Sequence, residues 1–185
     1  MKNSDVLLRQ FEVGLMENFV YFIGDKETRE VLVVDPAWEV DTILQKAQDE
    51  DLTIKGALIT HHHYDHTNGI EDLLKTHDIP VYINKHDMPW IDVQSTNIVQ
   101  VESAHKVQCG KVEVELIHTP GHTPGSQCFH VSNSLVSGDT LFINACGRCD
   151  FEGGNPKEMY FSLTQRLGKM SDDTILFPGH NYAAV

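Results

Sequence analysis

A dense group of potential metal ligands lies about one third of the way along this 185-residue chain. Its sequence over 61–66 is His-His-His-Tyr-Asp-His, which supplies His61, His63, Asp65 and His66. A short apolar run over 55–60 precedes the group and is typical of a buried strand, and a helical pattern follows over 67–75. We therefore expect the four side chains on a loop between a strand and a helix, where a rigid scaffold can hold functional groups.

The spacing within this loop allows it to serve two neighbouring metals. On an extended backbone, His61 and His63 lie two residues apart and point to the same side, whereas His62 between them points away. Asp65 and His66 lie at the turn into the helix and can face a second point nearby. One short segment can thus supply ligands to two adjacent sites.

Three further candidates follow other predicted strands at turns that contain glycine. They are His122 after Pro-Gly, Asp139 after Ser-Gly and His180 after Pro-Gly. Glycine lets the backbone turn sharply and lets a ligand approach closely. The full set has five imidazoles and two carboxylates with no required thiolate. Such nitrogen and oxygen donors suit zinc, with iron and manganese as alternatives.

The remaining pattern alternates strands with helices. Strands are predicted over 6–8, 11–13, 18–23, 31–34, 81–83, 111–118, 127–131, 134–137 and 174–177. Helices are predicted over 39–48, 86–93 and 155–170. The last begins with a strong start, in which Asn155 is the cap and Pro156 the first helical residue. We expect a fold of the α/β (α+β) class, in which two stacked mixed sheets carry helices outside, in one domain over 1–185.

Composition limits the classes of partner. The formal net charge of −13 opposes binding to nucleic acid, because so acidic a chain repels phosphate backbones. No run approaches 18 consecutive apolar residues, so no membrane span is predicted. The polar start of the chain does not match a signal peptide, and we expect a cytoplasmic protein. The spaced pair Cys146 and Cys149 lacks the second pair that a structural zinc site needs.

The seven candidates resemble the signature of the metallo-β-lactamase superfamily, His-x-His-x-Asp-His followed by single His, Asp and His ligands. The resemblance implies a four-layer αββα sandwich and two divalent metal ions. It implies a first metal at His61, His63 and His122, a second at Asp65, His66 and His180, and Asp139 as the bridge. Asp35 ends a buried strand where the family usually has an aspartate, which implies a partner for a ligand histidine.

Within that superfamily, three segments resemble the hydroxyacylglutathione hydrolases, or glyoxalase II. They are 146–154, 139–142 and 178–182. The resemblance implies that Arg148 and Tyr182 hold the glutathione part of a substrate. Phe151 falls where that family often has a tyrosine. The chain stops five residues after His180, whereas the longer hydrolases continue into a helical domain, so the short single-domain form is the nearer match.

The function implied is a metal-dependent hydrolase, a thioesterase for hydroxyacylglutathione-type thioesters. A metal-bound hydroxide would attack the carbonyl, Asp65 would help to orient it, and the thiolate would leave. One alternative is an iron-dependent persulfide (sulfur) dioxygenase, with a single iron at His61, His122 and Asp139. A lactone or ester hydrolase is another, and a metal-binding protein without catalysis represents a different class. The expected partner is a small-molecule thioester.

Overall fold

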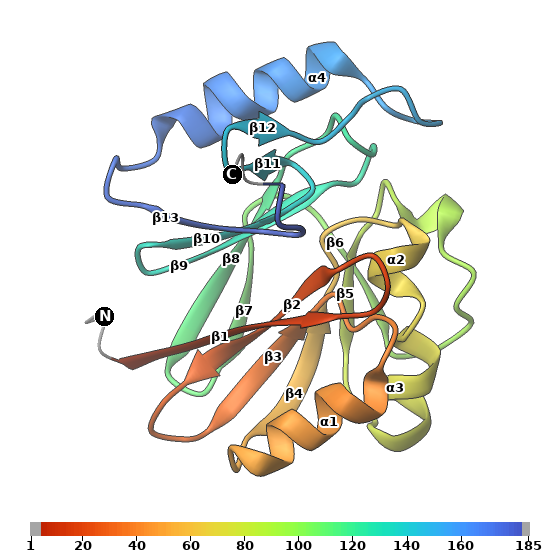
Figure 1. The fold of residues 1–185 in the computed structure, drawn as a ribbon, viewed down its shortest axis with the longest axis vertical. Coiled ribbons are helices and arrows are strands. Elements are labelled where there is room, and N and C mark those ends of the chain that lie inside the picture. The colour runs from red at the N-terminus through yellow and green to blue at the C-terminus, as the bar shows by residue number, and fades with distance from the viewer. Residues whose placement is uncertain (1–4, 183–185) are drawn as a thin grey trace.

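The computed structural model describes residues 5–182, and two β-sheets packed face to face dominate it (Figure 1). The first sheet has the order β1-β2-β3-β4-β5-β6. Its strands are β1 (Val6–Val13), β2 (Asn18–Asp25), β3 (Glu30–Val34), β4 (Thr53–Leu58), β5 (Val81–Asn84) and β6 (Ile98–Val101). The second sheet has the order β13-β10-β9-β8-β7. Its strands are β7 (His105–Cys109), β8 (Val112–His118), β9 (Gln127–Val131), β10 (Ser134–Gly138) and β13 (Ile175–Pro178).

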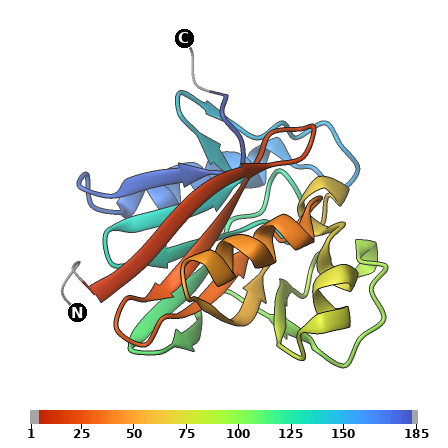
Figure 2. The same ribbon diagram turned by 60° about the horizontal axis from the view of Figure 1, so that its bottom comes forward.

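Helices cover the outer face of each sheet, so the predicted four-layer sandwich is confirmed. On the first sheet lie α1 (Val40–Asp49) and α3 (Ile70–Thr76), while α4 (Pro156–Phe161) covers the second. Figure 2 shows α1 in front of the first sheet and α4 on the opposite side of the molecule. A short helix, α2 (Tyr64–Thr67), and a small hairpin of β11 (Leu141–Phe142) and β12 (Ala145–Cys146) complete the structure. No helix within residues 5–182 is long and apolar enough to cross a membrane.

Three apolar clusters separate the layers, and strand periodicity assigns residues to them. In β2, Phe22 faces the helices on the outside, whereas its neighbours Tyr21 and Ile23 face the second sheet. Successive strand residues point to opposite faces, so a central strand between two apolar layers has apolar residues throughout. In β8 the alternation places Val112, Val114 and Leu116 between the sheets. The third cluster, around Leu135 and Leu167, lies under the last helical segment.

Strand direction gathers several loops at one edge of the sandwich. In the second sheet β8, β10 and β13 run in the same direction, because β8 and β10 are both antiparallel to β9 and β13 is parallel to β10. In the first sheet β3 and β4 are parallel and β2 is antiparallel to β3. The carboxyl ends of β3 and β4 therefore lie beside the amino end of β2. The candidate ligands follow the carboxyl ends of β4, β8, β10 and β13.

The structure corrects several element boundaries. The strands predicted over 6–8 and 11–13 form one strand, because β1 pairs with β2 in unbroken register through its polar residues. The helix predicted over 67–75 corresponds to α3, and a separate short helix, α2, precedes it in the segment that was predicted as a loop. The helix predicted over 86–93 contains only a 3-10 turn at Met88–Trp90, and the one predicted to about residue 170 passes after Phe161 through a π turn and a 3-10 turn. Strands β6, β7, β11 and β12 were not predicted.

Candidate metal centre

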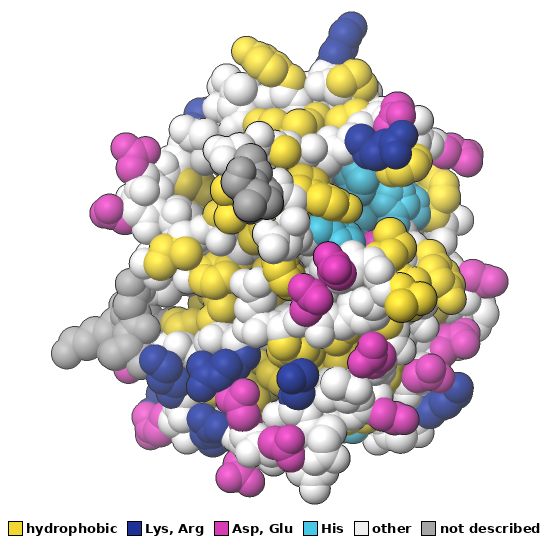
Figure 3. Space-filling view, in the orientation of Figure 1, with side chains coloured by type: hydrophobic (Ala, Val, Ile, Leu, Met, Phe, Trp, Pro, Cys, Tyr) yellow, Lys and Arg dark blue, Asp and Glu magenta, His cyan; other side chains and the backbone are white. Residues whose placement is uncertain are grey.

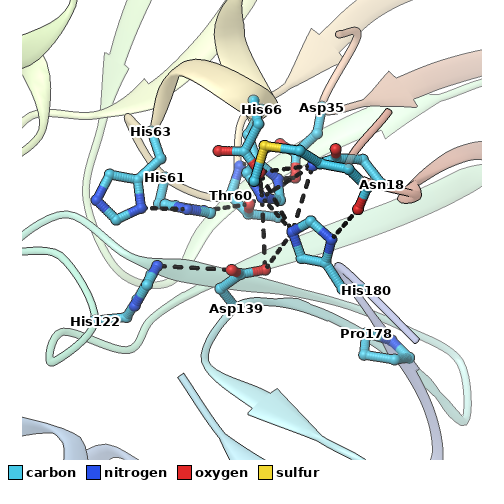
Figure 4. Close-up of polar contacts among 12 residues, drawn as sticks. Asn18, Asp35, Thr60, His61, His63, His66, His122, Asp139, Pro178 and His180 are labelled. Carbon is cyan, nitrogen blue, oxygen red and sulfur yellow. Dashed lines mark hydrogen bonds and ion pairs between the residues drawn. The ribbon is translucent and has the colours of Figure 1, made fainter. Parts of the chain in front are cut away.

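All seven residues predicted as ligands converge in one cluster at the edge of the sandwich where β4, β8, β10 and β13 end (Figure 4). Their donor atoms form three overlapping groups, each with all atoms within 4.8 Å of one another. The groups are His61, His63 and His122; His61, His66 and Asp139; and Asp65, His66 and His180. The cluster therefore joins a loop from the first sheet to three loops from the second.

Two histidines of the 61–66 segment and one from the second sheet form the first part of the cluster. His61 Nε2 and His63 Nδ1 lie 3.1 Å apart, and the ring of His122 is within 4.8 Å of both rings between centroids. His62 lies outside the cluster, as expected, and its ring stacks on Trp90. The alternation of an extended segment thus places His61 and His63 on one side.

Asp139 lies between two parts of the cluster. Its Oδ1 is 3.5 Å from His66 Nε2 and 3.7 Å from His180 Nε2, while its Oδ2 is 3.7 Å from His122 Nε2. Asp65 completes the second part, with Oδ2 at 3.3 Å from both His66 Nε2 and His180 Nε2. The two oxygens of Asp139 therefore face different sets of histidines, an arrangement compatible with a bridging carboxylate.

Buried oxygen acceptors determine which nitrogen of two histidines faces the cluster. His66 Nδ1 lies 2.9 Å from Asp35 Oδ2, and Thr60 Oγ1 lies 2.6 Å from the same oxygen. Because the threonine hydroxyl donates to Asp35, its oxygen is free to accept from His61 Nδ1 at 3.0 Å. In their neutral forms, both imidazoles then carry hydrogen on Nδ1 and present the lone pair of Nε2 to the cluster. Asp35 therefore has the contact that its position predicted.

Main-chain carbonyl groups orient two more histidines of the cluster, His122 and His180. His122 Nδ1 lies 2.7 Å from the carbonyl oxygen of Arg148, and His180 Nδ1 lies 3.1 Å from that of Met16. A carbonyl only accepts, so each Nδ1 is the donor and each Nε2 again presents a lone pair. Four imidazoles are thus oriented by their surroundings so that Nε2 faces the cluster.

Two glycines allow the loops to approach this closely. Gly138 has φ of +49°, and a Cβ there would lie 2.5 Å from the Cβ of Thr60. Gly179 precedes His180, and a Cβ there would lie 2.4 Å from Asp139 Oδ1. Larger residues would collide with the cluster or its supports. The Gly-bearing turns noted in the sequence therefore have a packing reason.

Burial and the nearby carboxylates shift the histidine pKa values in opposite directions. Burial lowers the pKa of His63 to about 4, lowers that of His61 well below 6.5, and also lowers that of His122. For His66, burial acts in the same direction, but Asp139, Asp35 and Asp65 together outweigh it and hold its pKa well above 6.5. Most of the cluster is therefore neutral imidazole, the form that binds a metal.

A direct structural observation indicates that these donor atoms fit a pair of metal ions. His122 Nε2 and Asp139 Oδ1 are buried and have no hydrogen-bond partner among the described residues. Leaving such atoms unpaired is costly unless another group satisfies them. Neutral imidazole nitrogens and carboxylate oxygens that converge without donors of their own are suited to a divalent cation. The set fits zinc, iron and manganese chemistry alike.

Two buried polar residues support the cluster and were missed by the sequence interpretation. Asn18 donates from Nδ2 to Asp65 Oδ2 at 2.9 Å, and Trp38 Nε1 donates to Asn18 Oδ1 at 2.8 Å. Asp87 is fully buried and accepts from the backbone N–H of His62 and of Gly125. Nothing in the sequence pattern singles out either residue, because their partners come from distant segments.

Asp87 connects the two loops that carry the first three histidines. Its Oδ2 accepts from His62 N at 2.8 Å and from Thr123 Oγ1 at 2.8 Å, while its Oδ1 accepts from Gly125 N at 2.5 Å. His62 lies between two candidate ligands, and Thr123 follows a third. One carboxylate thus sets the distance between the 61–66 segment and the loop after β8.

The predicted substrate contacts line a cavity of about 560 Å³ that opens onto the cluster. Arg148 is in its lining but makes a two-pronged ion pair with Asp150, at 2.7 and 2.6 Å, and its guanidinium lies over the ring of Phe151. Tyr182 also lines the cavity and stacks on His180 with 5.3 Å between ring centroids. Both residues predicted to hold a substrate are therefore beside the cluster.

Comparisons with known proteins agree with this geometry. A family model described as the metallo-beta-lactamase superfamily matches residues 13–180. A probable polyketide biosynthesis zinc-dependent hydrolase, PksB of Bacillus subtilis, is 31% identical over 89% of this chain and 73% of its own length. The hydroxyacylglutathione hydrolase of Shewanella halifaxensis is 37% identical over 90% of this chain and 62% of its own length. The crystal structure of ETHE1 from Myxococcus xanthus superposes with a TM-score of 0.86 and 31% identity, over 97% of this chain and 77% of that chain.

Proposed function

The chain belongs to the metallo-beta-lactamase superfamily, and from that premise we propose that it is a metal-dependent thioesterase for hydroxyacylglutathione-type substrates. The observation that carries the proposal is the position of Asp139 between two histidine groups, with one carboxylate oxygen toward each. The likeness to the Shewanella hydroxyacylglutathione hydrolase supports this substrate class. The likeness to PksB, whose name includes zinc dependence, supports zinc as the first metal to test.

In this proposal the seven residues hold two metals as the sequence predicted. His61, His63 and His122 would hold the first, Asp65, His66 and His180 the second, and Asp139 would bridge them. When bound, divalent metals would supply Lewis acidity and water that ionises near neutral pH. Asp35 and the carbonyl groups of Met16 and Arg148 keep the imidazoles oriented for this task.

In this proposal the side chains of the protein orient the nucleophilic water and contribute little general acid catalysis. Asp65 is fixed by the amide of Asn18, and its second role in the proposal is to orient the nucleophilic water. Burial raises its pKa, but the contacts with His180, His66 and the amide of Asn18 outweigh burial and leave the pKa lowered, so the side chain remains a carboxylate that accepts hydrogen bonds. A thiol pKa of about 8.5 makes thiolate a good leaving group, so no strong general acid is needed.

Arg148 and Tyr182 are proposed to contact the thiol part of the substrate. Arg148 now pairs with Asp150, and both side chains are 64% exposed. An exposed ion pair contributes little to stability, because water screens the two charges. A substrate carboxylate can therefore replace Asp150 as the partner of the guanidinium at little cost.

Hydrolysis of S-lactoylglutathione by metal-loaded protein tests the proposal. The wild-type protein should hydrolyse the thioester, and the His61→Ala variant should lose the activity together with bound metal. A His130→Ala variant is a suitable control, since His130 lies on β9 with no place in the cluster. Turnover by wild type no higher than that of His61→Ala would reject a thioesterase.

The iron-dependent persulfide dioxygenase is the second candidate, because the likeness to ETHE1 extends over 97% of this chain. It would require a single iron at His61, His122 and Asp139. Metal analysis of protein purified without added metal, together with oxygen uptake in the presence of glutathione persulfide, separates the two functions. Iron at one equivalent with oxygen uptake would favour the dioxygenase, and two equivalents without uptake would favour the thioesterase.

A further inference from the structure

The cavity beside the cluster has a largely apolar lining. Its volume of about 560 Å³ is in the range of sites that bind small organic molecules. The lining residues outside the cluster include Met16, Tyr64, Phe142, Ala145, Phe151 and Tyr182. In Figure 3 the histidines lie in a hollow that hydrophobic side chains border on more than one side. A ligand that reaches the cluster must therefore pass along apolar surface.

Aromatic rings of this lining contact both parts of the cluster. Phe142, on β11, lies edge-on to Tyr182 with 4.8 Å between ring centroids, and Tyr182 in turn stacks on His180. Phe151 lies 5.2 Å from His63 between ring centroids, also edge-on. If a thioester carbonyl lies at the cluster, an apolar group attached to it would lie next to these rings, with Phe142 and Tyr182 on one side and Phe151 on the other.

The lining offers little to bind a charged or strongly polar acyl group. Among its described residues Arg148 is the one lysine or arginine, and the proposed function assigns its guanidinium to a carboxylate in the thiol part of the substrate. The lining carboxylates, Asp65 and Asp139, face the histidines. Meanwhile Met16 and Phe151 remain 51% and 44% exposed, so a bound apolar group would remove their surface from water.

We propose that the thioester bound here carries an apolar acyl chain larger than the methyl group of a lactoyl substituent. The inference rests on the proposed thioesterase function and refines its substrate class. A hydroxyl group next to the carbonyl is compatible with it, because the apolar lining acts on the remainder of the chain. Affinity then comes from burial of methylene groups against Met16, Phe142 and Phe151.

Two series of S-acylglutathiones test the preference for a longer acyl chain. One series is unsubstituted and runs from acetyl to hexanoyl, and the other runs from lactoyl to 2-hydroxyhexanoyl. Burial of one methylene contributes about 0.8 kcal/mol, which corresponds to roughly fourfold in kcat/KM. With partial burial, we expect kcat/KM to rise at least about tenfold across the four methylenes of the unsubstituted series, and to rise as well across the three methylenes of the hydroxylated series. A flat or falling series, or a preference for lactoyl over 2-hydroxyhexanoyl, would overturn the proposal while leaving a thioesterase. No hydrolysis in either series would reject the thioesterase and this inference with it.

Matched pairs of variants at exposed positions test whether the lining residues cause the rise of kcat/KM with acyl-chain length. Met16→Ser should lower the ratio of hexanoyl to acetyl kcat/KM, whereas Leu15→Ser should not, because Leu15 is 96% exposed and outside the lining. Phe151→Ser and Phe161→Ser form a second such pair, with Phe161 on α4. Melting temperatures of all four variants verify folding. Equal ratios in the lining variants and their controls would contradict binding of the acyl chain at this wall.

Discussion

Asp35 Oδ2 lies 2.9 Å from His66 Nδ1, and the same oxygen accepts a hydrogen bond from the hydroxyl of Thr60. Its other oxygen accepts from the backbone N–H of Thr60 at 2.7 Å. The residue is buried and has φ of +49°, a conformation that is uncommon outside glycine but more accessible to aspartate and asparagine. Asp35 therefore fixes a candidate ligand of each proposed metal, His66 directly and His61 through Thr60.

Replacing Asp35 by asparagine should weaken metal binding and leave the backbone conformation in place. The amide would direct N–H groups at His66 or Thr60, which are both donors to the carboxylate, so at least one of them loses its acceptor. Loss of such a supporting partner typically costs about 10–100-fold in metal affinity. Zinc titration against a chromophoric chelator measures the change. The exposed Asp173→Asn is the control, and equal affinities for both variants would contradict this role of Asp35.

Asp87→Ala should destabilise the metal-free protein and also weaken metal binding. Three donors from two loops, at His62, Thr123 and Gly125, would lose their acceptor in a buried place. Hydrogen bonds to a charged group contribute about 1.5–3 kcal/mol each, and we expect a loss of roughly 3 kcal/mol in the free energy of unfolding. Urea denaturation measures the loss, and cobalt absorption spectra report the geometry of the site.

The control for Asp87 comes from the same segment. Asp92 is exposed and five residues further on, so Asp92→Ala should leave both the unfolding free energy and the cobalt spectrum unchanged. If Asp87→Ala lowers stability but the cobalt spectrum stays that of wild type, Asp87 supports the fold without positioning the histidines.

The sequence predicts the gathering of the seven candidate ligands because their position depends on strand direction and local turns. Each of His122, Asp139 and His180 follows a strand whose carboxyl end lies at the same edge, and a glycine-bearing turn then brings the side chain into the cluster. The supports Asn18 and Asp87 could not be predicted in this way. Their partners depend on how the two sheets and their loops pack, which no local pattern encodes.

The element boundaries failed for similar reasons. A continuous helical pattern over 67–75 does not reveal that Gly69 lies against the backbone of Pro36, where a Cβ would come within 2.4 Å of its carbonyl oxygen. The break between α2 and α3 lies at this tertiary contact. Strands β6 and β7 are short, and β7 is half polar, so neither shows a clear period. Their pairing with β5 and β8 defines them, and a single sequence does not contain that information.

Cysteine reactivity should follow burial and separate the four thiols into three classes. Burial raises the pKa of Cys109 to about 12 and that of Cys128 to about 11, whereas Cys146 is exposed at the cavity and Cys149 is partly buried. At pH 8, a chromogenic disulfide reagent should label Cys146 quickly and Cys149 more slowly, because thiolate is the reactive form. Labelling of the other two should require guanidinium. Cys146→Ser should remove the fast phase, and native labelling of Cys109 would contradict its burial.

The metal-free protein should be most stable near pH 6.5, because the pKa values of its buried histidines are shifted in opposite directions. The pKa of His63 is lowered to about 4 by burial, so below about pH 6.5 the unfolded chain binds protons that the native state does not, and stability falls as pH drops toward 4. The pKa of His66 is raised by Asp139, Asp35 and Asp65 against the effect of burial. The contribution of His66 to the free energy of unfolding is therefore complete below pH 6.5 and is lost as pH rises through its native pKa. Urea midpoints of chelator-treated protein from pH 4.5 to 9 should show this maximum, and His63→Asn should make its acid side less steep, since the lowered pKa values of His61 and His122 remain. A curve that rises or falls throughout would show that one of the two shifts is absent.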